Sequence, residues 1–347
     1  MNMISDLKSL HESHRATWNG DIPADYGSAD AEYRLLRESC GWIDFSNVGK
    51  AILTGEDRKG WLQGQITQDL RNFDDGTYTQ ACILSPTGQI VADIGLWGLG
   101  EEFAMLLPST SAEAALRRLR QMLILEDVKI EELTSSHGLI SIQGPTASEI
   151  LGDRIELPRL SAGVVPLEKG EVRLLRHDRS GMGGWDLLFP SELVKDVVKI
   201  LEGIEPVGYN AWNAARIEVG IPVYGQDIDE RTLAMEMGPD FISRTISFDK
   251  GCYTGQEIVQ RIHARGHANR TWVGLIAEDE FAAGANVSHP NREEAGKVTS
   301  YANSPDYGPI GAAMIRAEVA RDGDIVSIQT DKGPISAEIV IMPIRQV

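Results

Sequence analysis

The last quarter of the chain contains the pattern that restricts the fold most. Between residues 272 and 342, six short apolar runs alternate with Gly, Pro and Asp turns, and none has the spacing of an amphipathic helix. The runs cover residues 272–277, 285–287, 296–301, 310–314, 325–329 and 337–342. Such strands bury their apolar sides by closing into a ring or by packing as two sheets. We therefore predict a small β-barrel or sandwich.

An earlier region predicts a mixed lobe. Three apolar runs, at residues 77–84, 90–99 and 103–107, precede the clearest helical pattern of the chain at 111–123, and a further run follows at 128–133. Pro86 and Gly88 fit a hairpin turn between the first two runs. Ser111 is expected to cap the helix. Three strands, a helix and a strand in this order predict an α+β lobe with an antiparallel sheet.

A second unit of similar composition begins at residue 139. It contains expected strands at 139–143, 172–177 and 185–189, and expected helices at 146–151, 193–201 and 210–219. A chain of 347 residues has room for two or three domains at about 150 residues each. We predict an N-terminal α+β lobe at 1–137, a second α+β lobe at 138–270 and a β-barrel at 271–347. The boundary between the first two lobes is compatible with a lobe formed from separate stretches of the chain.

The charge of the chain excludes several classes of partner. The 33 basic and 51 acidic residues give a formal charge of −18, which disfavours nucleic-acid binding through a general positive field and repels anionic membranes. No apolar stretch approaches the roughly 18 residues of a membrane span, and residues 1–19 contain no signal-peptide pattern. We expect a cytoplasmic monomer that contacts neither nucleic acid nor membrane directly.

The three cysteines, Cys40, Cys82 and Cys252, are too few and too scattered for a disulfide framework. No C-x-x-C pair occurs, so one chain cannot supply a four-thiolate zinc or iron–sulfur site. Cys40 and Cys82 lie in apolar patterns and are expected to be inert core residues. No metal site is predicted elsewhere.

The segment from Arg244 to Arg270 is the densest in chemical groups. It contains five basic residues against two acidic ones, a net charge of +3. One interpretation is a turn into a helix whose arginines pair with the acidic surface. The other begins with Cys252, because Lys250 and a helix beginning near Gly255 would both favour its thiolate. The residues alone leave both interpretations open.

The octapeptide Lys250-Gly-Cys-Tyr-Thr-Gly-Gln-Glu257 resembles the K-G-C-Y-x-G-Q-E signature of the YgfZ family. These folate-binding proteins are related to the T-protein of the glycine cleavage system, GcvT. Residues 216–222 and 225–229 resemble the family's R-x-E-x-G-x-P and G-x-D-I segments, and residues 62–67 resemble a loop of its first domain. The resemblance extends from about residue 42 to residue 343.

This resemblance implies two ferredoxin-like α+β lobes and a C-terminal barrel around a central channel for reduced folate, with tetrahydrofolate as the cofactor. It places Asp186 on the acid that holds the pterin in the T-protein, and Trp185 on the neighbouring aromatic residue. A carboxylate can accept two N–H donors of the pteridine edge, and an indole can form an apolar wall. Gly183, Lys250 and Arg261 are further candidate folate contacts.

The resemblance leaves two functions from different classes. In the first, the chain is an accessory protein for the assembly or repair of [4Fe–4S] enzymes, including some that modify tRNA. Cys252 is then the working residue, and iron–sulfur client or assembly proteins are the partners. In the second, the chain is a folate-dependent aminomethyltransferase in which Asp93 positions the substrate amine. The T-protein strand G-G-x-x-D-D reads Gly88 to Asp93 here, with Ala92 replacing one acid. The intact signature and the missing acid favour the first function.

Overall fold

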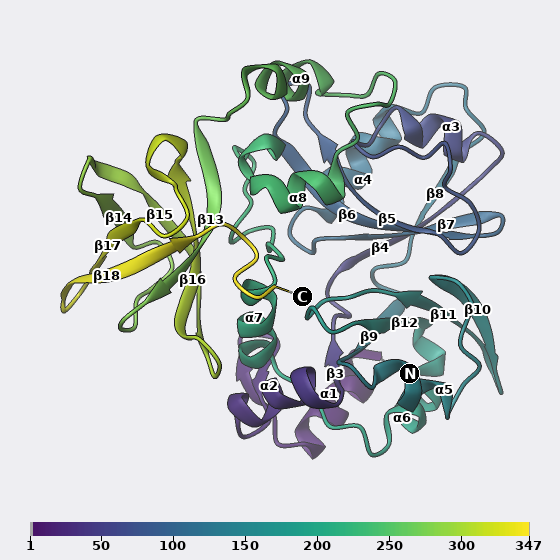
Figure 1. The fold of residues 1–347 in the computed structure, drawn as a ribbon. Helices are drawn as coiled ribbons and strands as arrows, with labels where there is room; N and C mark the ends of the chain where they lie inside the picture. The colour runs from purple at the N-terminus through teal and green to yellow at the C-terminus, as the bar shows by residue number, and fades with distance from the viewer. Residues whose placement is uncertain (1–2, 347) are drawn as a thin grey trace. The chain divides into compact units, whose positions relative to one another are not determined.

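A computed structural model describes residues 3–346 of the chain. These residues form two compact units (Figure 1). Unit 1 contains the residues up to 61 together with 70–79 and 94–212, and unit 2 contains 62–69, 80–93 and the residues from 213 onward. The predicted outer limits at residues 1 and 347 lie outside the described residues. The two predicted boundaries between the three domains remain predictions.

Unit 1 contains a five-stranded antiparallel sheet with the order β10-β11-β12-β9-β3. Its strands are β3 (Gly41–Asp44), β9 (His137–Gln143), β10 (Ala162–Leu167), β11 (Gly170–Arg176) and β12 (Gly184–Pro190). Helices α5 (Ala147–Gly152) and α6 (Val194–Leu201) share one apolar core with this sheet. The remaining short elements of this unit are α1 (Met3–Ser13), β1 (Thr17–Asn19), β2 (Ile22–Asp25), α2 (Ala29–Glu38) and the 3₁₀ turn η1 (Ser191–Leu193).

Strand β10 was not predicted from the sequence. It contains Pro166 and lies at the edge of the sheet, where a missing backbone N–H costs no hydrogen bond. One face of α2 is apolar, because Tyr33 and Leu36 of this helix and the adjacent Cys40 are all buried.

A second five-stranded sheet has the order β5-β6-β7-β4-β8. It consists of β4 (Gly49–Thr54), β5 (Tyr78–Leu84), β6 (Ile90–Leu99), β7 (Glu102–Leu107) and β8 (Lys129–Glu132), and the limits of the units pass through β5 and β6. The helices of this region are α3 (Arg58–Gln63) and α4 (Ala112–Gln121). The predicted α+β class is confirmed. The predicted cap is wrong, because the buried hydroxyl of Ser111 makes no capping hydrogen bond.

The barrel of unit 2 is closed by six strands in the order β13-β16-β15-β14-β17-β18, drawn green to yellow in Figure 1. They are β13 (Arg270–Ala277), β14 (Asn286–His289), β15 (Arg292–Ser304), β16 (Gly308–Arg316), β17 (Ile325–Thr330) and β18 (Gly333–Val340), with η3 (Ala317–Val319) between β16 and β17. Each strand contributes apolar side chains to one core. The predicted β-barrel is therefore confirmed, and each of its six predicted runs lies in a strand or at its end.

The helices before the barrel are α7 (Tyr209–Glu218), η2 (Ala234–Glu236), α8 (Gly238–Thr245) and α9 (Gln256–Arg265). Arg216 of α7 is fully buried, and its guanidinium pairs with the equally buried Asp227 at 2.5 Å. Ser300 of β15 donates to the same carboxylate at 2.8 Å. This ion pair fixes α7 against the barrel. Within residues 3–346, no helix has both the length and the apolar character needed to cross a membrane.

Candidate functional site

Asp186 lies on β12 with no exposed surface, and its carboxylate is enclosed by two basic side chains of the same unit. Arg179 donates from Nε to Oδ1 at 3.1 Å and from Nη2 to Oδ2 at 2.7 Å. Nδ1 of His177 lies 2.9 Å from Oδ2. Both oxygens therefore have protein partners. The predicted direct contact with a pterin lacks the free, accessible oxygen that it requires.

The loop between β11 and β12 carries these two basic residues and is itself fixed. Strands β11 and β12 pair with Leu175 opposite Asp186, so the loop that joins them returns to the carboxylate. The side-chain amide of Gln143 donates to the carbonyl of His177 at 2.8 Å, and its oxygen accepts the N–H of Arg179 at 2.8 Å. The loop is thus held from the neighbouring strand β9.

The charges of this cluster favour an ionised Asp186 and a neutral His177. Burial alone would raise the pKa of Asp186, but the charges and hydrogen bonds of Arg179 and His177 hold it well below its usual range. Burial lowers the pKa of His177, and the charge of Arg179 lowers it further, against the opposite effect of Asp186. At neutral pH the cluster is therefore a carboxylate, a guanidinium and a neutral imidazole.

Trp185 does not reach this cluster. Successive side chains of a strand point to opposite faces, so Trp185 points away from the face of Asp186. It is 4% exposed, belongs to the apolar core of the sheet, and donates its indole N–H to Ser148 at 3.0 Å. The structure therefore gives Trp185 a place in the core of unit 1, and its role as a ligand wall remains a prediction. Gly183 is a turn residue with φ of +83°, a conformation that few other residues adopt.

Asp93 lies on the part of β6 that belongs to unit 2, and its carboxyl has different surroundings from that of Asp186. Its side chain is half-buried, and its Oδ1 is buried without a hydrogen-bond partner among residues 3–346. Burial raises the pKa of Asp93 to about 6, and the negative charge of Asp227 adds to this effect. The backbone N–H of Asp93 and the charge of Arg244 act in the opposite direction. A carboxyl of this kind is partly protonated near neutral pH.

Arg244 of α8 contributes charge to Asp93 but has its hydrogen bonds elsewhere. Its guanidinium donates to Asp240 at 3.0 Å, to Gln80 at 2.7 Å and to the carbonyl of Gly220 at 3.2 Å. The arginine is thus held in place by three groups, none of which is Asp93. This arrangement explains how Asp93 keeps an unpaired oxygen within the influence of a guanidinium.

Lys250 has a structural role that the sequence did not indicate. It is 6% exposed, and its ammonium donates to the carbonyls of Gln63, Ile66 and Gln68 at 2.6, 2.8 and 2.8 Å. Burial lowers the pKa of Lys250 to about 8. All three ammonium protons hold the 63–68 loop, and the roles of Lys250 as a folate contact and as an activator of Cys252 remain predictions.

The rest of the octapeptide is partly packed, and Gly251, Cys252 and Glu257 are exposed. Gly255 has φ of +83°, and a Cβ there would lie 2.7 Å from the carbonyl oxygen of Ser85, so only glycine fits. Tyr253 is buried, and its hydroxyl has no hydrogen-bond partner in the described part of the chain. Cys252 is exposed, whereas Cys40 and Cys82 are buried as predicted. Packing therefore explains Tyr253 and Gly255 but not the exposed Cys252.

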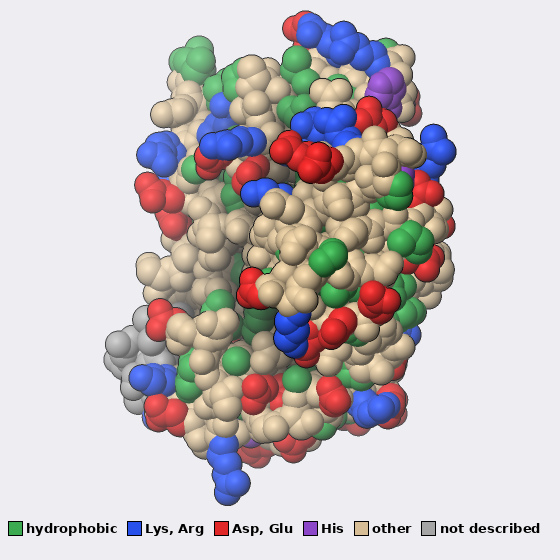
Figure 2. Space-filling model, turned by 90° about the vertical axis from the view of Figure 1, so that its left-hand side faces the viewer, with side chains coloured by type: hydrophobic (Ala, Val, Ile, Leu, Met, Phe, Trp, Pro, Cys, Tyr) green, Lys and Arg blue, Asp and Glu red, His purple; other side chains and the backbone are tan. Residues whose placement is uncertain are grey.

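The basic island of the sequence is largely neutralised. Arg261 pairs with Glu257 at 2.9 Å on the exposed side of α9, and Arg270 forms two hydrogen bonds with Glu236. With Arg244 and Lys250 also engaged, this result favours the interpretation in which the arginines pair with acidic residues. Basic and acidic side chains are likewise interspersed over the face shown in Figure 2. Nothing in these pairings marks Arg261 as a folate contact.

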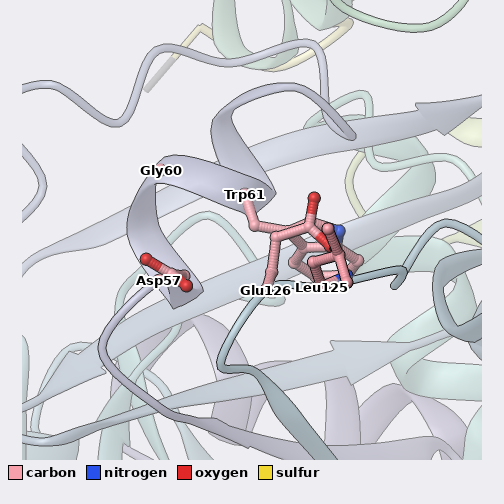
Figure 3. Close-up of a pocket in the computed structure, with 5 residues that line it drawn as sticks. All are labelled: Asp57, Gly60, Trp61, Leu125 and Glu126. Carbon is pink, nitrogen blue, oxygen red and sulfur yellow. The ribbon is translucent and has the colours of Figure 1, made fainter.

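A surface cavity of unit 1 contains none of the predicted site residues. It has a volume of about 440 Å³ and is lined by Asp57, Gly60, Trp61, Leu125 and Glu126 (Figure 3). The indole of Trp61 donates to the carbonyl of Met122 at 3.3 Å, and Leu125 is almost fully exposed. The two acidic residues of the cavity, Asp57 and Glu126, are exposed. The cavity therefore offers no group of unusual reactivity.

The sequence analysis missed His177, Arg179 and Arg244. The hairpin of β11 and β12 is a signal that could have identified the first two residues, because an antiparallel pair returns a short loop to the strand that follows it. The role of Arg244 has no comparable signal, since Gln80 lies 164 residues away in the sequence.

Comparison with known proteins agrees with the fold. Residues 13–250 match the GCVT N-terminal domain, and residues 270–344 match the glycine cleavage T-protein C-terminal barrel domain. An aminomethyltransferase of Rubrobacter xylanophilus is 28% identical over 354 residues, covering 96% of this chain and 92% of that protein. An aminomethyltransferase of Prosthecochloris aestuarii is 27% identical over 340 residues, covering 93% and 92%.

A crystal structure of the glycine cleavage system aminomethyltransferase T from Bartonella henselae has the same fold. Its TM-score is 0.89 at 20% identity, with 98% of this chain and 97% of that chain covered. The two domain matches together span nearly the whole sequence in the order of the T-protein. This chain therefore belongs to the glycine cleavage T-protein (GCVT) family.

Proposed function

We propose that the chain binds tetrahydrofolate and transfers a one-carbon unit to it from an aminomethyl donor. Aminomethyltransferases of this family use tetrahydrofolate as the one-carbon carrier. The observation that carries the proposal is the unpaired, buried Oδ1 of Asp93, on a carboxyl whose pKa is raised to about 6. Such a group can exchange a proton with an amine near neutral pH.

The residues present fit a ligand with many N–H donors. In unit 1, the ring of His177 makes a single hydrogen bond with the protein in the described part of the chain, so it has an acceptor to offer. The pteridine of a reduced folate presents amino and ring N–H groups that need such acceptors. Tetrahydrofolate, when bound, supplies the nitrogens that take up the one-carbon unit.

Asp93 is the residue of this chain that would move the proton. In its ionised form it attracts and orients the ammonium of the donor, and in its protonated form it can return a proton to the departing amine. The backbone N–H of Asp93, and after it the charge of Arg244, which is fixed by three other groups, lower the pKa of the carboxyl and favour its ionised form. Ala92 is fully buried where the T-protein has a second acid, so the position next to Asp93 in the chain supplies no carboxylate.

The test is formation of methylene-tetrahydrofolate from tetrahydrofolate and an aminomethylated carrier protein. We expect turnover by the full chain and a loss of about 100-fold or more in Asp93→Asn, which keeps the shape but cannot exchange the proton. Asp279→Asn removes an exposed acid of the same unit and serves as the control. Wild-type chain without turnover, at folate concentrations where it binds, would reject the transferase reaction.

A second candidate function rests on Cys252. The resemblance of residues 250–257 to the YgfZ signature, and the exposure of Cys252 beside the buried Tyr253, support a role in assembling or repairing [4Fe–4S] enzymes, including tRNA-modifying ones. One thiolate cannot hold a cluster alone, so partner proteins or a small thiol would complete the ligands. The same chain could then bind folate without transferring a one-carbon unit.

The cysteine has its own test. We expect Cys252 to be alkylated by iodoacetamide in the folded protein, and Cys40 and Cys82 only after unfolding, because both are buried. In a strain that lacks its own homologue, the wild-type chain should restore [4Fe–4S] enzyme activity and Cys252→Ser should not, at unchanged thermal stability. Equal complementation by the serine variant would remove this candidate.

A further inference from the structure

One ring nitrogen of His177 has a hydrogen-bond partner in the described part of the protein, and the other has none. Its Nδ1 lies 2.9 Å from Oδ2 of Asp186, a carboxylate that is ionised at neutral pH, so Nδ1 carries the proton of the neutral ring. Nε2 then has a lone pair. The ring of His177 makes no other hydrogen bond among the residues that the structure describes, and the side chain is 13% exposed while that of Asp186 is fully covered.

Aromatic residues of unit 1 hold the ring in one orientation. Trp97 and Tyr78 stack with ring centres 4.7 Å apart, and His177 lies 5.1 Å from Trp97 and 5.7 Å from Tyr78. The indole N–H of Trp97 donates to the carbonyl of Arg176 at 3.1 Å. This hydrogen bond connects the stacked pair of Trp97 and Tyr78 to β11, the strand that ends next to His177. The acceptor is therefore already oriented before any ligand arrives.

We infer that Nε2 of His177, and not the carboxylate of Asp186, accepts an N–H of the amino-pyrimidine edge of the pteridine. This inference rests on the proposed folate binding. Asp186 and Arg179 are then positioning residues. Asp186 fixes the tautomer and the direction of the ring, and Arg179 occupies the carboxylate oxygens that a ligand would otherwise need.

The assignment predicts a pH dependence that a carboxylate acceptor would not show. The ionisable groups near His177 are Asp186 on β12, Asp178 and Arg179 on the loop, and Tyr78 on β5. Burial and Arg179 lower the pKa of His177, so the acceptor persists at neutral pH. Protonation at lower pH replaces the lone pair of Nε2 by an N–H, and the affinity for the pteridine falls.

The experiment is calorimetric titration of the full chain with 5-formyltetrahydrofolate, a chemically stable reduced folate, between pH 5 and pH 8. At pH 7.5 we expect His177→Ala to raise the dissociation constant about tenfold or more. His177→Gln should recover most of the affinity, since an amide can donate to Asp186 and accept from the ligand, and should remove the loss of affinity at low pH. His267→Gln changes an exposed histidine of unit 2 and should behave as wild type.

The outcomes separate this inference from the proposed function. If wild type binds the folate and His177→Ala binds it equally well, His177 is not the acceptor and the folate proposal stands. If wild type shows no binding at any pH, both fall. Should His177→Ala fail to fold, the pH profile of His177→Gln decides, and a profile identical to that of wild type would overturn the inference.

Discussion

Two aspartates on β-strands of this protein have opposite surroundings. Asp186 of unit 1 is fully buried and accepts hydrogen bonds from Arg179 and His177, and its pKa lies well below the usual range. Asp93 of unit 2 is half-buried with an unpaired oxygen, and burial raises its pKa to about 6. Burial opposes the charge of both carboxylates, and only at Asp186 do basic partners outweigh it.

The comparison separates structural from chemical roles. A carboxylate with every oxygen occupied holds other groups in place, whereas a carboxylate that lacks a partner can exchange protons with a ligand. Asp186 is therefore the residue that positions other side chains, and Asp93 is the proposed proton-transfer residue. The resemblance in sequence suggested instead that Asp186 meets the ligand, because a motif identifies a position in a fold but not the neighbours that occupy its side chain.

The largest expected effect is at Asp186. Replacement by Asn leaves Arg179 and His177 with an uncharged partner and should lower the free energy of unfolding by about 3–5 kcal/mol at pH 7. Because the pKa of Asp186 is depressed, this stability is present above the ordinary value of 3.8 and is lost as the pH falls toward the folded-state pKa. Urea unfolding at several pH values measures both effects.

The control for this prediction is Asp153→Asn, an exposed acid of the same unit. A loss in Asp186→Asn no greater than in this control would mean that the carboxylate is not held as described, and the contrast with Asp93 would disappear.

Lys250 extends the comparison to a buried cation with all its partners. Lys250→Met should lower the free energy of unfolding by about 2–4 kcal/mol, because three backbone carbonyls of the 63–68 loop lose their donor. Lys332→Met, at an exposed position, is the matched control. Thermal unfolding measures the difference, and a variant as stable as wild type would show that the loop does not depend on the ammonium.

The smallest effect has the opposite sign. Asp93→Asn removes a carboxylate that the fold disfavours, so it should raise the free energy of unfolding by about 1–3 kcal/mol at pH 8. The gain should vanish near pH 4, where the wild-type carboxyl is protonated, and should develop as the pH rises from the ordinary 3.8 toward about 6. Paired urea titrations at the two pH values test it. A destabilised variant at pH 8 would indicate that the carboxylate has a partner after all.

Much of the fold could be predicted from the sequence, because its signals are local. Turn residues such as Pro86 and Gly88 lie between apolar runs, and the six runs of the barrel carry their own spacing. The T-protein relationship could also be predicted from the residues that surround Cys252, and the domain matches agree with it. The narrower YgfZ assignment remains a prediction.

The partners of the candidate site residues were harder to predict. Lys250 donates to the carbonyl of Ile66, 184 residues earlier in the chain, and no local pattern indicates this contact. Arg179 is only seven residues from Asp186, yet their pairing depends on the register of a hairpin. The position of Lys250 near Cys252 in the sequence therefore did not indicate where the ammonium lies in the fold.

The ionisation of the two aspartates tests the account most directly. In full-length protein labelled with ¹³C at aspartate carboxyls, the resonances of Asp93 and Asp186 can be assigned from Asp93→Asn and Asp186→Asn and followed by NMR from pH 3 to pH 9. The account predicts a midpoint near pH 6 for Asp93 and an Asp186 that is still ionised where exposed aspartates take up their proton. An Asp93 that titrates at the ordinary 3.8 would contradict its assignment as the proton-transfer group.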